Sequence, residues 1–332
     1  MPTLGQRSIE QTGQLVGFSS SGPWIDNQCD LHRMFLVSDY CLPRQHLFRT
    51  VQLPHLQSVM STAVKSSADV ESAYAAAQKV VETHHRIAEF LHVGVTLAQI
   101  DRFVLETLDA LGCKSCFYKY RTGGLPPFPS QACLSLNDCV VHGTAGYYLE
   151  PLKAGDVLSI DIGVKYRGWM GDAAWTYVFG EMSPRVKKLT DSGKESLAQG
   201  IEQLRPGNTW LDWAKTVQRI VEAEYGFHLI RGLGGHGYGR KLHTPPWISN
   251  VVPAHPQEWP DGNQLIEPGA LVAVEPMIGI GTGEIEQGHK QWPIYTADHS
   301  LSVHYEHDVL VTSDGPRILT DGLQDVMDVI TR

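Results

Sequence analysis

The chain has 332 residues, of which 42% are hydrophobic and 19% are charged, and its formal net charge is -9. This composition is typical of a globular protein, and the negative charge argues against a general nucleic-acid binder, which needs a basic excess to neutralise phosphate. No run of about 18 apolar residues occurs, so no membrane-spanning helix is predicted. Because the first residues also lack the apolar core of a signal peptide, we expect a cytoplasmic protein.

Residues 1–65 show no clean helical or strand period, and we interpret them as an N-terminal extension of unknown role before a main domain at 66–332. Apolar residues at helical spacing predict a helix over 70–91 and a second helix that ends before Gly112. Thr96 followed three residues later by Gln99 is a capping-box pattern, which places the start of the second helix.

The same plan returns in the second half of the chain. Ser183-Pro184 is a good helix start, and Thr209 opens a further helix that ends at Gly226. Gly94-x-Thr96 and Gly207-x-Thr209 match with an offset of 113 residues, and short strand-like runs follow in both halves. This pattern predicts a duplicated α+β fold, with pseudo-twofold helix-helix-strand halves around a central antiparallel sheet. A site between the halves would draw ligands from both.

The stretch SIDIGVKYRGWMGDAAWTY contains two aspartates in two apolar, strand-like runs, and it predicts an antiparallel hairpin. With the turn centred between Tyr166 and Arg167, Asp161 and Asp172 would lie directly opposite each other on one face. Two facing carboxylates repel unless a proton or a cation joins them, so the pair is a candidate cation site. The alternative is that one aspartate is a solvated turn or edge residue.

Three further candidates lie near glycine turns or strand ends. His236 is flanked by glycines, Glu275 ends an apolar run, and Glu306 precedes another. Together with Asp161 and Asp172 they form an oxygen-rich set with one imidazole, which suits two carboxylate-bridged divalent ions better than a structural zinc. The set accepts Co, Mn, Fe or Zn, so the metal stays open.

In this order and in the contexts IDIGV, GDAAWTY, GHGYGRKLHTPP, VEPM and YEH, the five residues resemble the type I methionine aminopeptidases, over about residues 70–313. The resemblance implies the pita-bread fold, with 66–332 as a catalytic domain that removes N-terminal methionine through a water activated by two divalent ions. Asp161 and Asp172 would hold one ion and His236 and Glu275 the other, with Asp172 and Glu306 helping to bridge them. Glu275 would also move the proton.

The resemblance further implies that His243 stabilises the carbonyl oxygen and that His142 contacts the scissile amide. It implies a pocket for the first side chain, lined by Thr122, Leu125, Phe128, Cys133, Leu242 and Trp292. Leu125 and Leu242 stand where the family usually has aromatic residues, and Gly163 replaces a more usual threonine, so the width of the pocket stays open. The expected partner is the N-terminus of a peptide or a nascent protein, near the ribosome, and a monomer is expected.

Two other readings compete with this one. A proline-specific aminopeptidase or dipeptidase on the same fold would usually carry a substantial N-terminal domain, and residues 1–65 are short for one. A non-catalytic binding protein on the pita-bread scaffold would have lost metal ligands, whereas all five candidates are present here.

Overall fold

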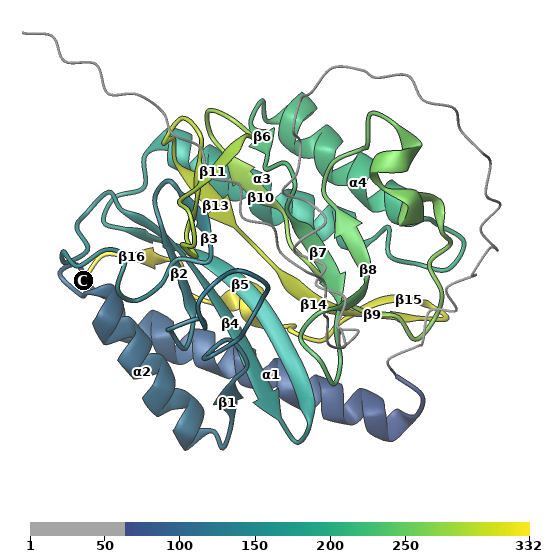
Figure 1. The fold of residues 1–332 in the computed structure, drawn as a ribbon, viewed down its shortest axis with the longest axis horizontal. Helices are drawn as coiled ribbons and strands as arrows, with labels where there is room; N and C mark the ends of the chain where they lie inside the picture. Colours follow the sequence, from purple (N-terminus) through teal and green to yellow (C-terminus); the bar gives the residue numbers. More distant parts are fainter. Residues whose placement is uncertain (1–63) are drawn as a thin grey trace, which may run out of the picture.

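The computed structural model describes residues 64–332 (Figure 1). Residues 1–63, almost all of the predicted N-terminal extension, lie outside the described residues. The described part combines four α-helices with mostly antiparallel strands, which confirms the α+β class. Within residues 64–332, no helix is both long enough and apolar enough to cross a bilayer.

The first helix of the described residues begins three residues before the predicted start at 70, whereas the second begins at the predicted capping box. Helix α1 (Ser67–Phe90) starts after Ser66, whose hydroxyl accepts a hydrogen bond from the Asp69 amide. Helix α2 (Leu97–Ala110) starts after Thr96, and the predicted capping box with Gln99 is present. Both caps satisfy amide groups that a helix N-terminus leaves without intrahelical partners.

The second helix pair repeats this arrangement. Helix α3 (Pro184–Ile201) is capped by Ser183, and α4 (Trp210–Gln218) follows Thr209 and continues as a π-helix, Arg219–Glu224. The glycines of the two matching turns have nearly the same left-handed backbone, with φ of 95° at Gly94 and 94° at Gly207. The shared turn geometry agrees with the predicted duplication.

The strands lie between the two helix pairs in Figure 1. The first half contains β1 (Lys114–Ser115), β2 (Cys133–Leu136), β3 (Cys139–Val141), β4 (Val157–Tyr166) and β5 (Trp169–Phe179). The second half contains β6 (His228–Leu229), β7 (Gly234–Gly237), β8 (Thr244–Ser249), β9 (Leu271–Val274), β10 (Met277–Gly279), β11 (Ile285–Gln287), β12 (Ile294–Thr296), β13 (Ser302–His304), β14 (His307–Thr312), β15 (Gly315–Ile318) and β16 (Val329–Ile330). Short 3-10 helices lie at Pro256–Glu258, Pro260–Asn263 and Leu323–Asp325.

Strands from the two halves meet beside β5. One sheet has the order β1-β4-β5-β16, in which β2 also pairs with β4 and β16 comes from the second half of the chain. Another sheet, of second-half strands, has the order β15-β14-β9-β7-β8. The Glu306 amide donates a hydrogen bond to the Ala174 carbonyl across the junction, at 2.9 Å. The C-terminal strand β16 pairs in parallel with β5, whereas the other paired strands are antiparallel.

The hairpin of β4 and β5 forms, but its register corrects the prediction. Tyr166 pairs with Trp169, so the turn residues are Arg167 and Gly168, with φ of 49° and 82°. Positive φ at both central positions is typical of the two-residue turn that matches strand twist, and a glycine adopts it readily. Asp161 therefore lies opposite Ala174, and Asp172 lies opposite Gly163. The two aspartates share a face, but they are offset diagonally rather than directly opposed.

Helix α1 packs on the face of the β4-β5 hairpin that lies opposite the aspartates. A Cβ on Gly171 would lie 2.7 Å from the Ala76 carbonyl oxygen, so α1 sits directly on that side of β5. Successive strand residues point to opposite faces, which turns Asp172 away from α1 and toward the second half. On the same face as Asp172, Phe117 and Cys116 crowd Gly163, where a Cβ would lie 2.4 Å and 2.5 Å from their side chains.

Candidate metal centre

Strands and strand ends position all five predicted ligands. Asp161 lies in the middle of β4 and Asp172 in β5. His236 lies in β7, which is paired with β9, and Glu275 follows the last residue of β9. Glu306 lies between β13 and β14, beside β5.

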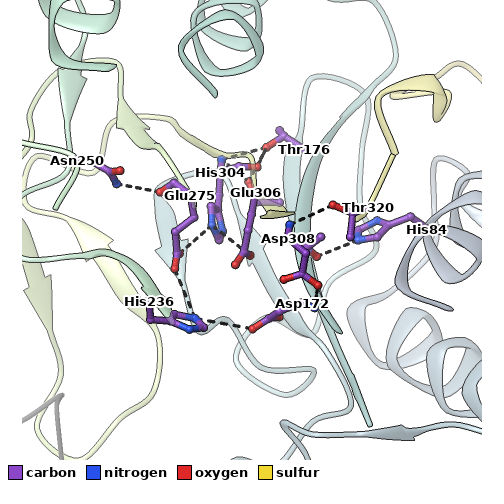
Figure 2. Close-up of polar contacts among 12 residues, drawn as sticks. His84, Asp172, Thr176, His236, Asn250, Glu275, His304, Glu306, Asp308 and Thr320 are labelled. Carbon is purple, nitrogen blue, oxygen red and sulfur yellow. Dashed lines mark hydrogen bonds and ion pairs between the residues drawn. The ribbon is translucent and has the colours of Figure 1, made fainter. Parts of the chain in front are cut away.

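Four of these residues and a further histidine point toward one another (Figure 2). His236 Nε2 lies 3.9 Å from Asp172 Oδ2 and 3.8 Å from Glu275 Oε1. His304 Nε2 lies 3.2 Å from Glu275 Oε2 and 3.9 Å from Glu306 Oε2. Their ligand atoms form two groups, each within 4.8 Å, and Glu306 belongs to both. One group is Asp172, His236 and Glu306, and the other is Glu275, His304 and Glu306.

Asp161 belongs to neither group of described residues, although it shares their face of the hairpin. Burial, with a contribution from Glu275, raises its pKa to about 7, while His304 acts in the opposite direction. The structure thus places Asp161 in the same electrostatic environment as the two groups.

Negative charge is concentrated in this site. Burial raises the pKa of Glu275 to about 7. The pKa values of Asp172 and Glu306 rise well above the usual carboxyl range, first through burial and then through neighbouring carboxylates. Within residues 64–332, three of these carboxylates form ion pairs, and their partners are histidines rather than lysine or arginine. Asp172 and Glu275 pair with His236, and Glu275 and Glu306 pair with His304. Such a cluster is costly unless protons or a cation neutralise it.

The donor atoms fit divalent cations. Asp161 Oδ1, Asp172 Oδ1 and His304 Nε2 are buried without a hydrogen-bond partner, and buried polar atoms are rarely left in this state. Carboxylate oxygens and imidazole nitrogens are ligands for Mn, Fe, Co and Zn. These residues could therefore hold a metal, and the shared Glu306 gives the site the form of two adjoining positions.

Of the two histidines predicted to flank the metals, His243 lies beside the candidate ligand His236, and His142 lies beside Trp292. The His243 ring centroid is 4.4 Å from that of His236, and its Nδ1 lies 2.9 Å from the Tyr120 hydroxyl. His142 follows β3 with a φ of 59°, a left-handed backbone that is uncommon outside glycine and concentrated at functional sites. Its ring contacts the edge of Trp292, with centroids 5.9 Å apart.

Comparisons with known proteins agree with this geometry. The sequence model of metallopeptidase family M24 matches residues 71–313 of this chain. The chain belongs to metallopeptidase family M24. It is 36% identical to a methionine aminopeptidase of Aquifex aeolicus, over 79% of this chain and 100% of that protein. It is 29% identical to the Escherichia coli methionine aminopeptidase, over 82% of this chain and 98% of that protein.

Solved structures confirm the pita-bread fold expected for an M24 protein. A crystal structure of methionine aminopeptidase from Thermotoga maritima matches with a TM-score of 0.70 and 32% identity, over 77% of this chain and 98% of that one. An Xaa-Pro dipeptidase from Bacillus anthracis matches with a TM-score of 0.60 and 19% identity. The match covers 78% of this chain and 62% of that chain. The second likeness shows the fold alone, whereas the first supports the predicted resemblance to methionine aminopeptidases.

Most of the residues predicted to line the pocket come together in one cluster, in which Cys133 pairs with the candidate ligand Asp161 across strands β2 and β4. Phe117, Phe128, Cys133, Leu242 and Trp292 form a buried apolar cluster, with Cys116, Tyr120 and Leu125 packed against it. The Phe128 and Trp292 rings meet edge to face with centroids 5.1 Å apart, and Trp292 Nε1 donates to the Pro126 carbonyl at 2.8 Å. Thr122 is not part of this apolar cluster; its carbonyl accepts a hydrogen bond from the Leu125 amide.

Three residues near the M24 site were missed by the sequence analysis. His304 and Asp308 each lie two residues from Glu306, a spacing that marks them as candidates but does not separate His304 from His307, because Glu306 lies between two strands. Asp308 Oδ2 accepts a hydrogen bond from the Asp172 amide at 2.9 Å. Tyr120, the partner of His243, carries no such signal, because the two residues are 123 positions apart.

Metal removal from this M24 site is expected to destabilise the protein more at about pH 7.5 than at about pH 5. Asp161 and Glu275, with pKa values raised to about 7, favour the metal-free fold while they are protonated. That contribution is complete below their ordinary values of 3.8 and 4.5 and is lost as the pH rises through about 7. Above that pH Asp161 and Glu275 are ionised, and a bound cation would neutralise them.

The measurement is the melting temperature with a divalent metal and with a chelator at both pH values. The melting temperature with metal minus that with chelator should be several degrees larger at the higher pH. Two buried histidines, His84 and His307, contribute to the pH dependence of stability in the opposite direction, because burial lowers their pKa values to about 4. Their ring nitrogens bond Tyr177, Ala173 and Thr320, so metal removal should not change this contribution, and it cancels in the difference at each pH. An equal effect of the chelator at both pH values would contradict the expectation.

Proposed function

We propose that the protein is a metal-dependent aminopeptidase that removes the N-terminal methionine from peptides and nascent proteins. The observation that carries this proposal is the pair of ligand groups sharing Glu306, in a chain that belongs to family M24 and aligns along almost the whole of its methionine aminopeptidase relatives. Geometry and family membership support the same chemistry independently.

The proposed ligands are Asp161, Asp172, His236, Glu275 and Glu306, for two divalent ions. Asp161 and Asp172 would hold one ion and His236 and Glu275 the other, with Asp172 and Glu306 helping to hold both. The membership of Glu306 in both groups of candidate ligand atoms supports its shared role. When bound, the ions would supply Lewis acidity toward the peptide carbonyl and a water that gives up a proton at neutral pH. Their identity among Co, Mn, Fe and Zn depends on availability as well as on the donors.

The protein's own residues then handle the proton and the substrate. Glu275 accepts the proton of the attacking water on its carboxylate and returns it to the leaving amine. His243, held by the Tyr120 hydroxyl, stabilises the charge that develops on the carbonyl oxygen. His142 contacts the scissile amide, and its ring is fixed against Trp292.

The apolar cluster of Phe128, Cys133, Leu242 and Trp292, with Leu125 at its edge, is the proposed pocket for the methionine side chain. These side chains are apolar or weakly polar, and burying an unbranched thioether among them is favourable. Thr122 remains a proposed lining residue at the edge of this group. The division into an extension at 1–65 and a catalytic domain at 66–332, a cytoplasmic location, a monomeric state and proximity to the ribosome also remain predictions.

A short peptide panel tests the proposed activity. With added Co or Mn, the protein is expected to release methionine from Met-Ala-Ser and to leave Ala-Pro peptides intact, because the apolar cluster matches a thioether and no feature described above selects proline. Release of the first amino acid, measured by chromatography, is the readout. Cleavage of Ala-Pro peptides without cleavage of Met-Ala-Ser would instead indicate the proline-specific class.

A further inference from the structure

His304 occupies a rigid position at the junction of the two halves. It is the last residue of β13, and its side chain is only 3% exposed. Its amide lies 3.1 Å from both the Ser159 hydroxyl of β4 and the Thr176 hydroxyl of β5, and its carbonyl accepts from Thr176 at 2.8 Å. The backbone of His304 is therefore fixed by both strands that carry the predicted aspartate ligands.

The His304 ring points into the carboxylate cluster (Figure 2). Its Nε2 lies 3.2 Å from Glu275 Oε2 and 3.9 Å from Glu306 Oε2. Despite these distances, Nε2 is buried without a hydrogen-bond partner, which indicates that it is not aligned as a donor to either carboxylate. Nε2 and one oxygen from each of the two glutamates form a group of ligand atoms within 4.8 Å.

The geometry distinguishes this histidine from the other buried histidines near the site. His307 Nδ1 is paired with the Thr320 hydroxyl at 2.8 Å, and His84 contacts the Tyr177 hydroxyl and the Ala173 carbonyl through its two ring nitrogens. Those rings have hydroxyl or carbonyl partners, whereas the inward nitrogen of His304 lies beside the carboxylate oxygens of Glu275 and Glu306.

We propose that His304 is a direct ligand of the ion that Glu275 and Glu306 hold, and so adds a second imidazole to the site. This inference rests on the proposed metal site and extends its ligand set to Asp161, Asp172, His236, Glu275, His304 and Glu306. An extra nitrogen donor strengthens binding of Co, Fe or Zn more than binding of Mn, which prefers oxygen ligands. His304 thus sets the metal preference of the site.

The test compares full-length His304→Gln with the wild type and with a matched control. Glutamine keeps a polar side chain that can reach the carboxylates, but it is a poor ligand for these ions. The control is His307→Gln, which also removes a buried imidazole from the same segment, but one that bonds Thr320 rather than facing the glutamates. Circular dichroism establishes that each variant folds, and His304→Asn is a second variant if His304→Gln does not.

Two readouts are independent of activity. X-ray absorption of the Co-loaded proteins reports imidazole scattering around the metal, which is expected to fall in His304→Gln and to stay unchanged in His307→Gln. Calorimetric titration is expected to show Co binding weakened by at least about tenfold in His304→Gln, with a smaller loss for Mn. Unchanged imidazole scattering and unchanged Co affinity in a folded His304 variant would overturn the proposal.

The wild type provides a check that needs no substitution. A Co-loaded spectrum that shows no more imidazole than His236 alone supplies would also overturn the assignment of His304. Hydrolysis of Met-Ala-Ser by the wild type, assayed in parallel, separates this result from the proposed function. An active enzyme with a single imidazole would retain the function and reject only the added ligand.

Discussion

Replacing Glu275 by glutamine is expected to lower kcat/KM for a methionyl peptide by about three orders of magnitude. The carboxylate lies 3.8 Å from His236 Nε2 and 3.2 Å from His304 Nε2, at the centre of the proposed ligand set. An amide of the same shape cannot accept the proton of the attacking water, and it is a weaker metal ligand. Steady-state kinetics on Met-Ala-Ser with saturating metal provide the measurement.

Glu267→Gln is the matched control for this substitution. Glu267 is exposed in the loop before β9, so the same loss of charge outside the site should leave kcat/KM nearly unchanged. Metal content must be measured for each variant, because a lost ion and a lost proton acceptor both reduce the rate. Wild-type activity in metal-saturated Glu275→Gln would refute the role of Glu275.

Gly235→Ala, which adds one methyl group next to His236, is expected to lower both the stability of the fold and the affinity for metal. A Cβ at this position would lie 2.3 Å from the Ala273 carbonyl oxygen and 3.2 Å from Val274 Cα. Both contacts are with backbone of β9, so no flexible side chain can move away. Strand β7 must shift from β9, which costs about 3 kcal/mol in free energy of unfolding and moves His236 relative to Glu275.

Two measurements check this expectation. Urea unfolding of the metal-free protein should show the loss of stability, and a metal titration should show weaker binding. Gly146→Ala is the control, because Gly146 is exposed and a Cβ there would meet nothing within 4 Å, so its stability should change by less than about 0.5 kcal/mol. A stable Gly235→Ala variant with wild-type metal affinity would show that the close strand contact is dispensable.

Local signals account for the parts of the fold that could be predicted from the sequence. Capping residues before α2 and α3 and the repeated Gly-x-Thr break fix where helices start, because they act through neighbouring backbone groups. The register of the β4-β5 hairpin could not be fixed in this way. Centring the turn one residue later shifts each pairing by two residues, and this leaves every side chain on the same face. Alternation of apolar residues therefore cannot choose between the two registers.

The candidate site was predictable where its residues lie in distinctive local contexts, as for His236 between glycines. Tyr120 and His304 show what such contexts leave out. Tyr120 reaches His243 only because the chain folds a loop from one half onto the other half, which no local pattern encodes. His304 lies in a short strand beside an equally plausible histidine, His307, and only the folded structure shows which ring faces the glutamates.

The junction at Glu306 has a consequence for how the enzyme matures. The proposed metal ligands come from β4 and β5 in one half and from β7, the end of β9 and the β13-β14 connection in the other. Two hydrogen bonds join the halves there, from the Glu306 amide to the Ala174 carbonyl and from the Asp172 amide to Asp308. A chain lacking metal holds repelling carboxylates at the boundary between the halves, which share one hydrophobic core. Amide hydrogen exchange along this boundary should therefore be faster in the apoprotein than in the metal-bound protein, and metal supply during synthesis becomes a determinant of the yield of folded enzyme.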